Sequence, residues 1–181
     1  MSDFLIYKDV SESQYAALEA ATTTVEEVKS LLVDIIGLSY DDVKKMSILT
    51  DLFFYSYAFC KDHAFDGRKT STFLSLMKQL FLRDMNEALR ADKTLSSSYE
   101  WFESNLMKHC VERVPHSVQV FEDHEVGVIH DFVVETYFRQ YRMYRYIFGV
   151  QARVKIQMML PQGIAIPKAS FQPLASGIQE S

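Results

Sequence analysis

Residues 48–60 read ILTDLFFYSYAFC, a run that is apolar on almost every face when it is wound into a helix. Ser39 and Asp42 precede it with the kind of polar side chain that opens helices, and the pattern continues to about Asp62. The aromatic and β-branched content is also typical of a strand, but the length and the capped start favour a helix. A helix that is apolar all round is usually buried. We therefore expect this helix to be the central one of an all-α fold.

Two further helices are predicted before this run. The range 11–21 begins with a serine that caps a short helix. Thr24, with Glu27 three residues later, forms a capping box for a helix over 25–36. Gly37 then ends this helix, because glycine readily adopts the left-handed conformation that closes helices.

Three more helices are predicted after the run, and each begins at a polar residue. A stretch of extended chain over 116–121 is expected between the last two of them, following Pro115. The predicted helices run from Asp66 to about Arg90, from Ser96–Ser98 to about Val111, and from Asp123 to about Phe148.

The last of these helices has a distinct apolar face when its residues are placed at 100° intervals. A separate face holds acidic residues first and arginines last, an order that suits the helix dipole. On that face Glu135 precedes Arg139 by four residues, a spacing that favours an ion pair. We expect the apolar face to share one core with residues 48–60. The residues predicted to be buried together are Leu52, Phe53, Tyr55, Phe59, Tyr137, Tyr141, Tyr144 and Phe148.

The composition agrees with one helical domain followed by a tail. The 181 residues include only 6 Gly and 4 Pro, and 48% of them are hydrophobic. So few helix breakers favour long helices over a fold of strands and turns, and this length suits one domain. We assign 1–10 to an N-terminal segment, 11–149 to an all-α domain of five to six helices, and 150–181 to an extended C-terminal tail.

Charge is divided unevenly along the chain. Residues 1–135 hold 13 Lys and Arg against 23 Asp and Glu, whereas 136–181 hold six basic residues and one acid. A mostly acidic body repels phosphates, which argues against a nucleic-acid partner. The basic C-terminal part is suited to an acidic protein partner. The residues predicted to bind a partner are Arg139, Arg142, Arg145, Arg153, Lys155, Ile156, Met158 and Met159.

The tail is expected to lie extended against a protein surface. Three of the four prolines fall within 161–181, which argues against a helix there. The stretch 150–160 is apolar and basic, and a short segment of this kind typically binds a groove or a sheet edge. Two binding surfaces remain possible for the tail: the surface of another protein, and the chain's own acidic body.

We find no motif for catalysis, a cofactor or a metal ion. The chain lacks a glycine-rich phosphate loop, a nucleophile elbow, a CxxC pair and an HExxH pair. Cys60 and Cys110 have apolar neighbours typical of inert packed thiols, and His130 is interpreted as a hydrogen-bonded core histidine. The start of the chain does not resemble a signal peptide, and no apolar run is long enough for a membrane helix. We expect a non-enzymatic protein of a reducing intracellular compartment, with an uncharacterised helical enzyme as the alternative class.

The stretch 136–155, TYFRQYRMYRYIFGVQARVK, is open to two interpretations. A basic amphipathic helix with bulky anchors is typical of a calmodulin target. Alternatively, the aromatic side chains belong to the core and the arginines face solvent. The core interpretation is favoured for the aromatic residues.

Three blocks of the sequence, which lie in order, together resemble the CLAMP family. They are Leu52–Tyr55 with Phe59–Phe65 and Lys69–Ser71; His109–Phe121; and Val133–Phe148, VVETYFRQYRMYRYIF. Members of that family often have His where this chain has Gln140, and Pro-Pro where it has Val114-Pro115, and neither departure disturbs the helical pattern. The resemblance implies an axonemal scaffold protein of a projection on the central-pair microtubules of cilia and flagella. It implies other projection subunits as partners, with calmodulin or tubulin as further candidates, and no catalytic activity. The alternative function is that of a calcium- or calmodulin-linked ciliary regulator that uses residues 136–155.

Overall fold

The computed structural model describes residues 5–20, 24–86, 94–113 and 118–148, all within one compact unit, Met1–Gln151. These residues hold seven α-helices and one 3-10 helix, and no strand is found among them. The segment that was predicted as one helix over 123–148 contributes the last two α-helices and the 3-10 helix between them. Counted as one unit, it brings the total to six, so the predicted all-α fold is confirmed. No helix in the described residues is long and apolar enough to span a membrane.

The first two helices begin where local sequence signals predict. In α1 (Glu12–Ala20), the backbone N–H of Ser11 donates to Oε1 of Gln14 at 2.9 Å, and Ser11 Oγ accepts the N–H of Gln14 at 3.3 Å. In α2 (Val25–Ile36), Thr24 Oγ1 accepts the N–H of Glu27 at 3.4 Å. Gly37 ends α2 at φ 64°, in the left-handed region where a side chain would be strained.

The run 48–60 lies in α3 (Val43–Asp62), but two of its predicted properties need correction. The cap is Asp42 and not Ser39, because the Asp42 carboxylate accepts the N–H of Lys44 at 2.9 Å. The helix is also not buried all round. It packs between α2 and α4 and leaves a third side open, where Tyr55 is 62% exposed.

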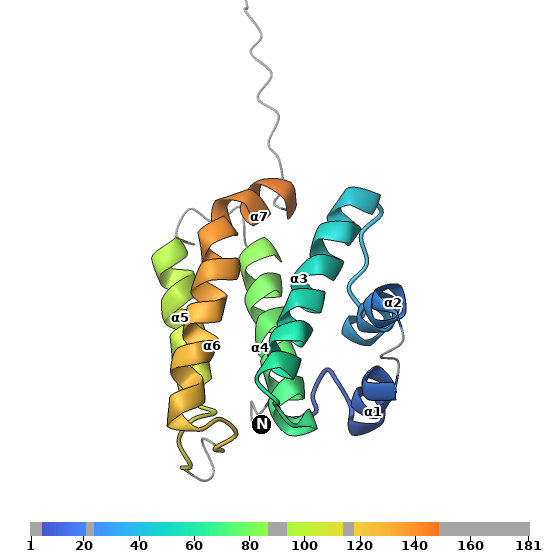
Figure 1. Cartoon of the computed structure of the whole chain (residues 1–181). Helices are drawn as coiled ribbons and strands as arrows, with labels where there is room; N and C mark the ends of the chain where they lie inside the picture. The colour runs from blue at the N-terminus through green and yellow to red at the C-terminus, as the bar shows by residue number, and fades with distance from the viewer. Residues whose placement is uncertain (1–4, 21–23, 87–93, 114–117, 149–181) are drawn as a thin grey trace, which may run out of the picture. The chain divides into compact units, whose positions relative to one another are not determined.

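The central helix is α4 (Gly67–Asn86), which lies behind α3 and α6 in Figure 1. Every residue from 70 to 77 is buried, including the hydroxyl side chains of Thr70, Ser71, Thr72 and Ser75. These hydroxyls have internal partners: Ser71 donates to the carbonyl oxygen of Val10 at 2.8 Å, and Ser75 accepts the N–H of Asp9 at 3.3 Å. The N-terminal residues before α1 thus pack directly on α4.

The fifth helix, α5 (Leu95–Met107), is shorter at its end than predicted. It begins at Thr94, whose hydroxyl accepts the N–H of Ser97 at 3.2 Å, and not at the serines that follow. After Met107 the chain turns, and the carbonyl oxygen of His109 accepts the N–H groups of Val120 and Phe121 at 2.7 and 3.0 Å. Within the predicted connection 116–121, residues 118–120 have no regular structure, and 116–117 lie outside the described residues.

The predicted helix over 123–148 is interrupted. It consists of α6 (Asp123–Thr136), the 3-10 helix η1 (Phe138–Gln140) and α7 (Tyr141–Phe148), and α7 turns across the end of the bundle (Figure 1). The cap of α6 is Glu122, paired with Glu125 in a capping box, and not Asp123. At the break, the Thr136 hydroxyl donates back to the carbonyl oxygen of Phe132 at 2.6 Å, a bond that tends to bend helices.

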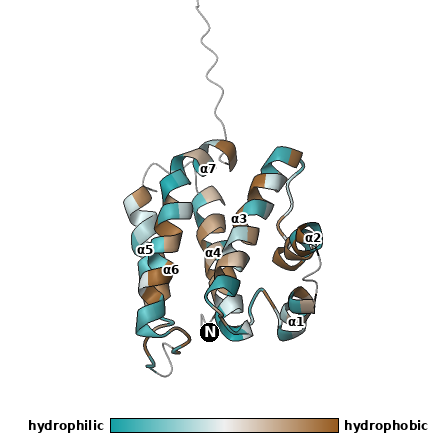
Figure 2. Cartoon of the chain, in the orientation of Figure 1, coloured by the Kyte–Doolittle hydropathy of each residue, from teal (hydrophilic) through white to brown (hydrophobic). Residues whose placement is uncertain are grey.

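Aromatic side chains fill the core. Figure 2 shows apolar and polar stretches alternating along the helices, as expected when each helix buries one side. Phe59 of α3 stacks on Phe132 of α6 with ring centroids 4.2 Å apart, and Phe81 of α4 meets Phe148 of α7 edge-on at 4.9 Å. Of the eight residues predicted to be buried together, all but Tyr55 are buried.

Candidate protein interaction surfaces

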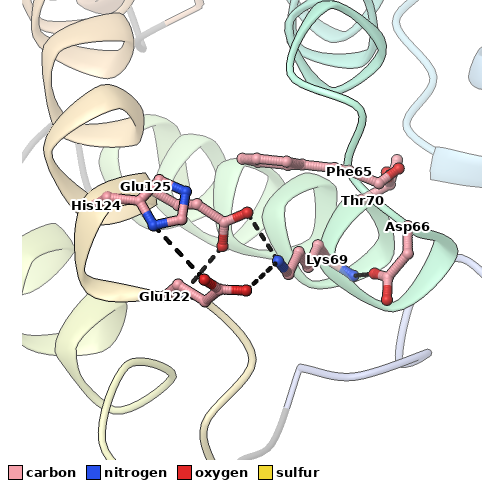
Figure 3. A network of polar contacts seen from close by, with 7 residues as sticks. All are labelled: Phe65, Asp66, Lys69, Thr70, Glu122, His124 and Glu125. Carbon is pink, nitrogen blue, oxygen red and sulfur yellow. Dashed lines mark hydrogen bonds and ion pairs between the residues drawn. The ribbon is translucent and has the colours of Figure 1, made fainter.

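A network of charged side chains joins the start of α4 to the start of α6 (Figure 3). Lys69 Nζ lies 2.7 Å from Oε1 of Glu125 and 3.6 Å from Oε1 of Glu122. The second carboxylate oxygen of Glu125 accepts the N–H of Glu122 at 2.9 Å. Hydrogen bonding to Glu125 raises the pKa of Lys69, which keeps the amine charged. Asp66 completes the network by accepting the N–H of Lys69 at 2.7 Å.

The sequence blocks that resemble the CLAMP family meet in space. Phe65 of the first block and Phe121 of the second have ring centroids 6.0 Å apart, beside the Lys69 network. Leu52 of the first block and Tyr144 of the third line one groove between α3 and α7. Residues of all three blocks therefore lie where α3, α4 and α6–α7 approach one another.

His109, from the second block, has a structural role. Its side chain is buried, Nδ1 lies 2.9 Å from the carbonyl oxygen of Asn105, and Nε2 accepts the N–H of Leu5 at 3.4 Å. Burial lowers the pKa of His109, so the ring is neutral with its hydrogen on Nδ1. Both ring nitrogens are thus occupied within the fold.

A buried carboxylate links α4, α5 and the α6–η1 junction. Asp84 is 1% exposed and accepts the hydroxyl hydrogens of Tyr137, at 2.9 Å, and of Ser98. Arg83 Nη1 lies 3.6 Å from Oδ1 of Asp84. Burial raises the pKa of Asp84, while the two hydroxyl donors and Arg83 act in the opposite direction. Within the described residues, Oδ1 of Asp84 and the hydroxyl of Tyr141 have no hydrogen-bond partner.

The open side of α3 forms one wall of a groove of about 440 Å³, which we call the α3–α6 groove. The opposite wall comes from α6, η1 and α7. The lining of the groove is mainly apolar surface, and each wall carries one acid. The α3 wall consists of Ile48, Asp51, Leu52 and Tyr55, and the other wall of Phe132, Glu135, Thr136, Gln140, Met143 and Tyr144.

The two acids of the α3–α6 groove differ in their partners. Asp51 Oδ1 lies 2.7 Å from Nζ of Lys29, a partly exposed ion pair. Glu135 is exposed and forms no ion pair with any residue that the structure describes. The predicted pair between Glu135 and Arg139 is absent, because α6 ends at Thr136 and η1 changes the spacing of the following residues.

The predicted partner-binding residues fall into three groups. Arg139 and Arg142 are exposed and have no ion-pair partner in the described part of the chain. Arg145 is half-buried, with its guanidinium carbon 5.8 Å from the centre of the Tyr141 ring. The others, Arg153, Lys155, Ile156, Met158 and Met159, lie outside the described residues.

Potentially reactive side chains occupy structural positions. Both cysteines are free and buried, and burial raises the pKa of each thiol, that of Cys110 to about 11. His130 Nε2 lies 2.6 Å from the hydroxyl of Tyr99, so the predicted hydrogen bond is present. The side chain is 35% exposed, however, so His130 lies at the edge of the core and not inside it as predicted. No group of three or more His, Cys, Asp or Glu within the described ranges is arranged to hold a metal ion.

Sequence reasoning missed both the buried carboxylate and the α3–α6 groove. Asp84 has no local signal, because its partners Ser98 and Tyr137 are 14 and 53 residues away. The groove had one available signal, the polar side of residues 48–60, where Asp51 and Tyr55 follow each other at i and i+4.

Comparison with known families agrees with this arrangement. The model of the CLAMP family, described as flagellar C1a complex subunit C1a-32, matches residues 55–156, more than half of the 181 residues. The match contains the second and third blocks and most of the first. It also extends eight residues beyond the end of α7. The family is described as a subunit of a flagellar complex and not as an enzyme. This chain belongs to the CLAMP family of flagellar C1a complex subunits.

Proposed function

We propose that this chain is a non-catalytic structural subunit of the C1a projection of the central apparatus, acting in the ciliary or flagellar axoneme through protein contacts. The family match over residues 55–156 carries the proposal. It is supported by the roles of the titratable groups, since His109, Asp84 and Lys69 are all engaged in interactions that hold helices together. Its partners are other subunits of the same projection.

The partner-facing surface is centred on Arg139 and Arg142. Both side chains are exposed next to the bend between α6 and α7, and neither is neutralised by an acid in the described part of the chain. Because most of the body is acidic, this basic patch favours one orientation toward an acidic partner. The acidic surface of a neighbouring subunit or of tubulin has the required charge.

The calmodulin alternative has weaker support. Its bulky anchors are Tyr137, Tyr141, Tyr144 and Phe148, and all four are at most 8% exposed within the domain. Calmodulin would have to pull α7 out of the core to reach them, at the cost of the aromatic contacts that hold it.

Charge reversal at the arginine pair tests the proposed surface. In ciliated cells that lack the native chain, Arg139→Glu/Arg142→Glu should reduce co-purification of the chain with C1a projection subunits at least tenfold. Loss of charge complementarity at a contact of this kind weakens association. The matched control, Lys44→Glu/Arg68→Glu, reverses two exposed charges elsewhere and should assemble normally. Normal assembly of the arginine variant would exclude this surface, whereas equal loss in both variants would point to net charge instead.

A further inference from the structure

We propose that the α3–α6 groove binds the chain's own segment 150–160, the first part of the tail. This inference does not depend on the proposed function. No described residue fills this groove. We assign the segment 150–160 to it, so that the segment binds the chain's own domain and not another protein.

The segment has the residue pattern that such a groove requires. From 150 to 158 the even positions are Val, Ala, Val, Ile and Met, and the odd positions are Gln, Arg, Lys and Gln. An extended backbone sends alternate side chains to opposite sides, so one side of this segment is apolar and the other basic. The described part of the chain has no strand to pair with the segment, but it has a groove with an apolar floor.

The groove and the segment also match in charge. The walls of the groove include Leu52, Phe132 and Tyr144, and its two acidic lining residues are Asp51 and Glu135. Asp51 is paired with Lys29, so Glu135 is the acid that a basic segment would meet without a competing ion pair in the described residues. With the apolar side of the segment on the floor, Arg153 and Lys155 face the acidic rim. A second hollow lies between α2 and α3 and is lined by Lys61 as well as Asp62. Because the lysine offsets the charge of the acid, this hollow does not favour a basic segment.

The length of chain after α7 allows this placement. Glu135 lies 13 residues before Phe148, which corresponds to at most about 20 Å along a helix. Lys155 lies seven residues after Phe148, or about 23 Å of extended chain. A segment that reverses at Gly149 and runs back along the groove therefore brings Arg153 and Lys155 to the level of Glu135. Glycine directly after a helix is the residue that most readily allows such a reversal.

Disulfide trapping in the full-length chain tests the proposal. Tyr55→Cys, on the rim, is combined with Gln157→Cys in the segment. The control combines Val25→Cys with Gln157→Cys, since Val25 is 50% exposed and lines the second hollow. Cys60 and Cys110 are buried and contribute little background. We expect the Tyr55→Cys pair to form an intramolecular disulfide at least tenfold faster than the control, at a rate independent of protein concentration.

The charge pairing is tested in the same background. Arg153→Glu/Lys155→Glu should slow trapping, and adding Glu135→Lys should restore part of the rate. Equal rates for the Tyr55→Cys and Val25→Cys pairs would overturn the proposal, as would a rate that the charge reversals leave unchanged. Covalent dimers whose yield rises with protein concentration would also overturn it, by placing the tail in the groove of a second copy.

Discussion

Phe59 shows how one residue supports several elements of this fold. The centroid of its ring lies 4.2 Å from that of Phe132 in α6 and 5.5 Å from that of Phe73 in α4. Phe59 therefore joins α3 to both of these helices. Tyr55, one turn earlier on the same helix, is 62% exposed. Two neighbouring aromatic residues therefore have very different expected contributions to stability.

We expect Phe59→Ala to lower the free energy of unfolding by about 3–5 kcal/mol, the usual cost of emptying an aromatic site in a core. Tyr55→Ala should change it by no more than about 0.5 kcal/mol, as is common for surface positions. Chemical denaturation of both variants measures the difference. Similar losses would contradict the packing of α3.

Asp84 should make stability depend on pH. Because burial raises its pKa in the folded state, the folded chain holds the proton more tightly than the unfolded chain. The contribution of Asp84 to stability is then greatest below its unfolded pKa of about 3.9. It declines as pH rises toward the folded pKa.

Asp84→Asn removes this titration but keeps an oxygen acceptor for the hydroxyls of Ser98 and Tyr137. We expect the free energy of unfolding of the native chain, relative to that of the Asn variant, to fall as pH increases from about 4. Denaturation of both proteins across pH measures this difference. A difference that grows with pH would show that Arg83 and the hydroxyl donors outweigh burial.

Among the contacts between helices, the Lys69 network links the start of α4 to the start of α6. Lys69→Met leaves the carboxylate of Glu125, 8% exposed, without its charged partner, and this should cost about 1–3 kcal/mol. The control is Lys61→Met. Its ion pair with Glu19 is more exposed, at 38% and 49% of the two side chains, so the loss should be below about 1 kcal/mol. Thermal unfolding measures the loss of stability in both variants. Equal losses would show that the Lys69 network stabilises the fold no more than an exposed ion pair does.

Helix boundaries were predictable where the signal is local. Thr24 and Gly37 bound α2 as expected, because a cap depends only on residues within one turn. The break after Thr136 was not predictable, since no glycine or proline marks it. The central position of α4 was also not predicted. Its buried serines, Ser71 and Ser75, form hydrogen bonds with residues more than 60 positions away, and no local pattern in the sequence indicates such partners.

For the whole molecule, the family membership and the charge distribution together indicate a protein that assembles with other subunits. An acidic helical body presents Arg139 and Arg142 at its bend, and the family to which the chain belongs is described as a flagellar C1a complex subunit. The fold class and the family were both predictable from sequence, whereas the α3–α6 groove was not. A groove depends on how α3 and α6–α7 pack, and that packing is set by contacts such as Phe59–Phe132 between residues far apart in the chain.

Electron cryo-tomography of axonemes tests whether this chain is a subunit of the C1a projection. The full-length chain, carrying a compact tag of known size, replaces the native chain in ciliated cells, and averaged central-pair projections are compared with those of untagged cells. We expect additional density at the C1a projection, and loss of density at the same place when the chain is absent. An unchanged C1a projection in both preparations, with the tag density elsewhere in the axoneme, would contradict this expectation.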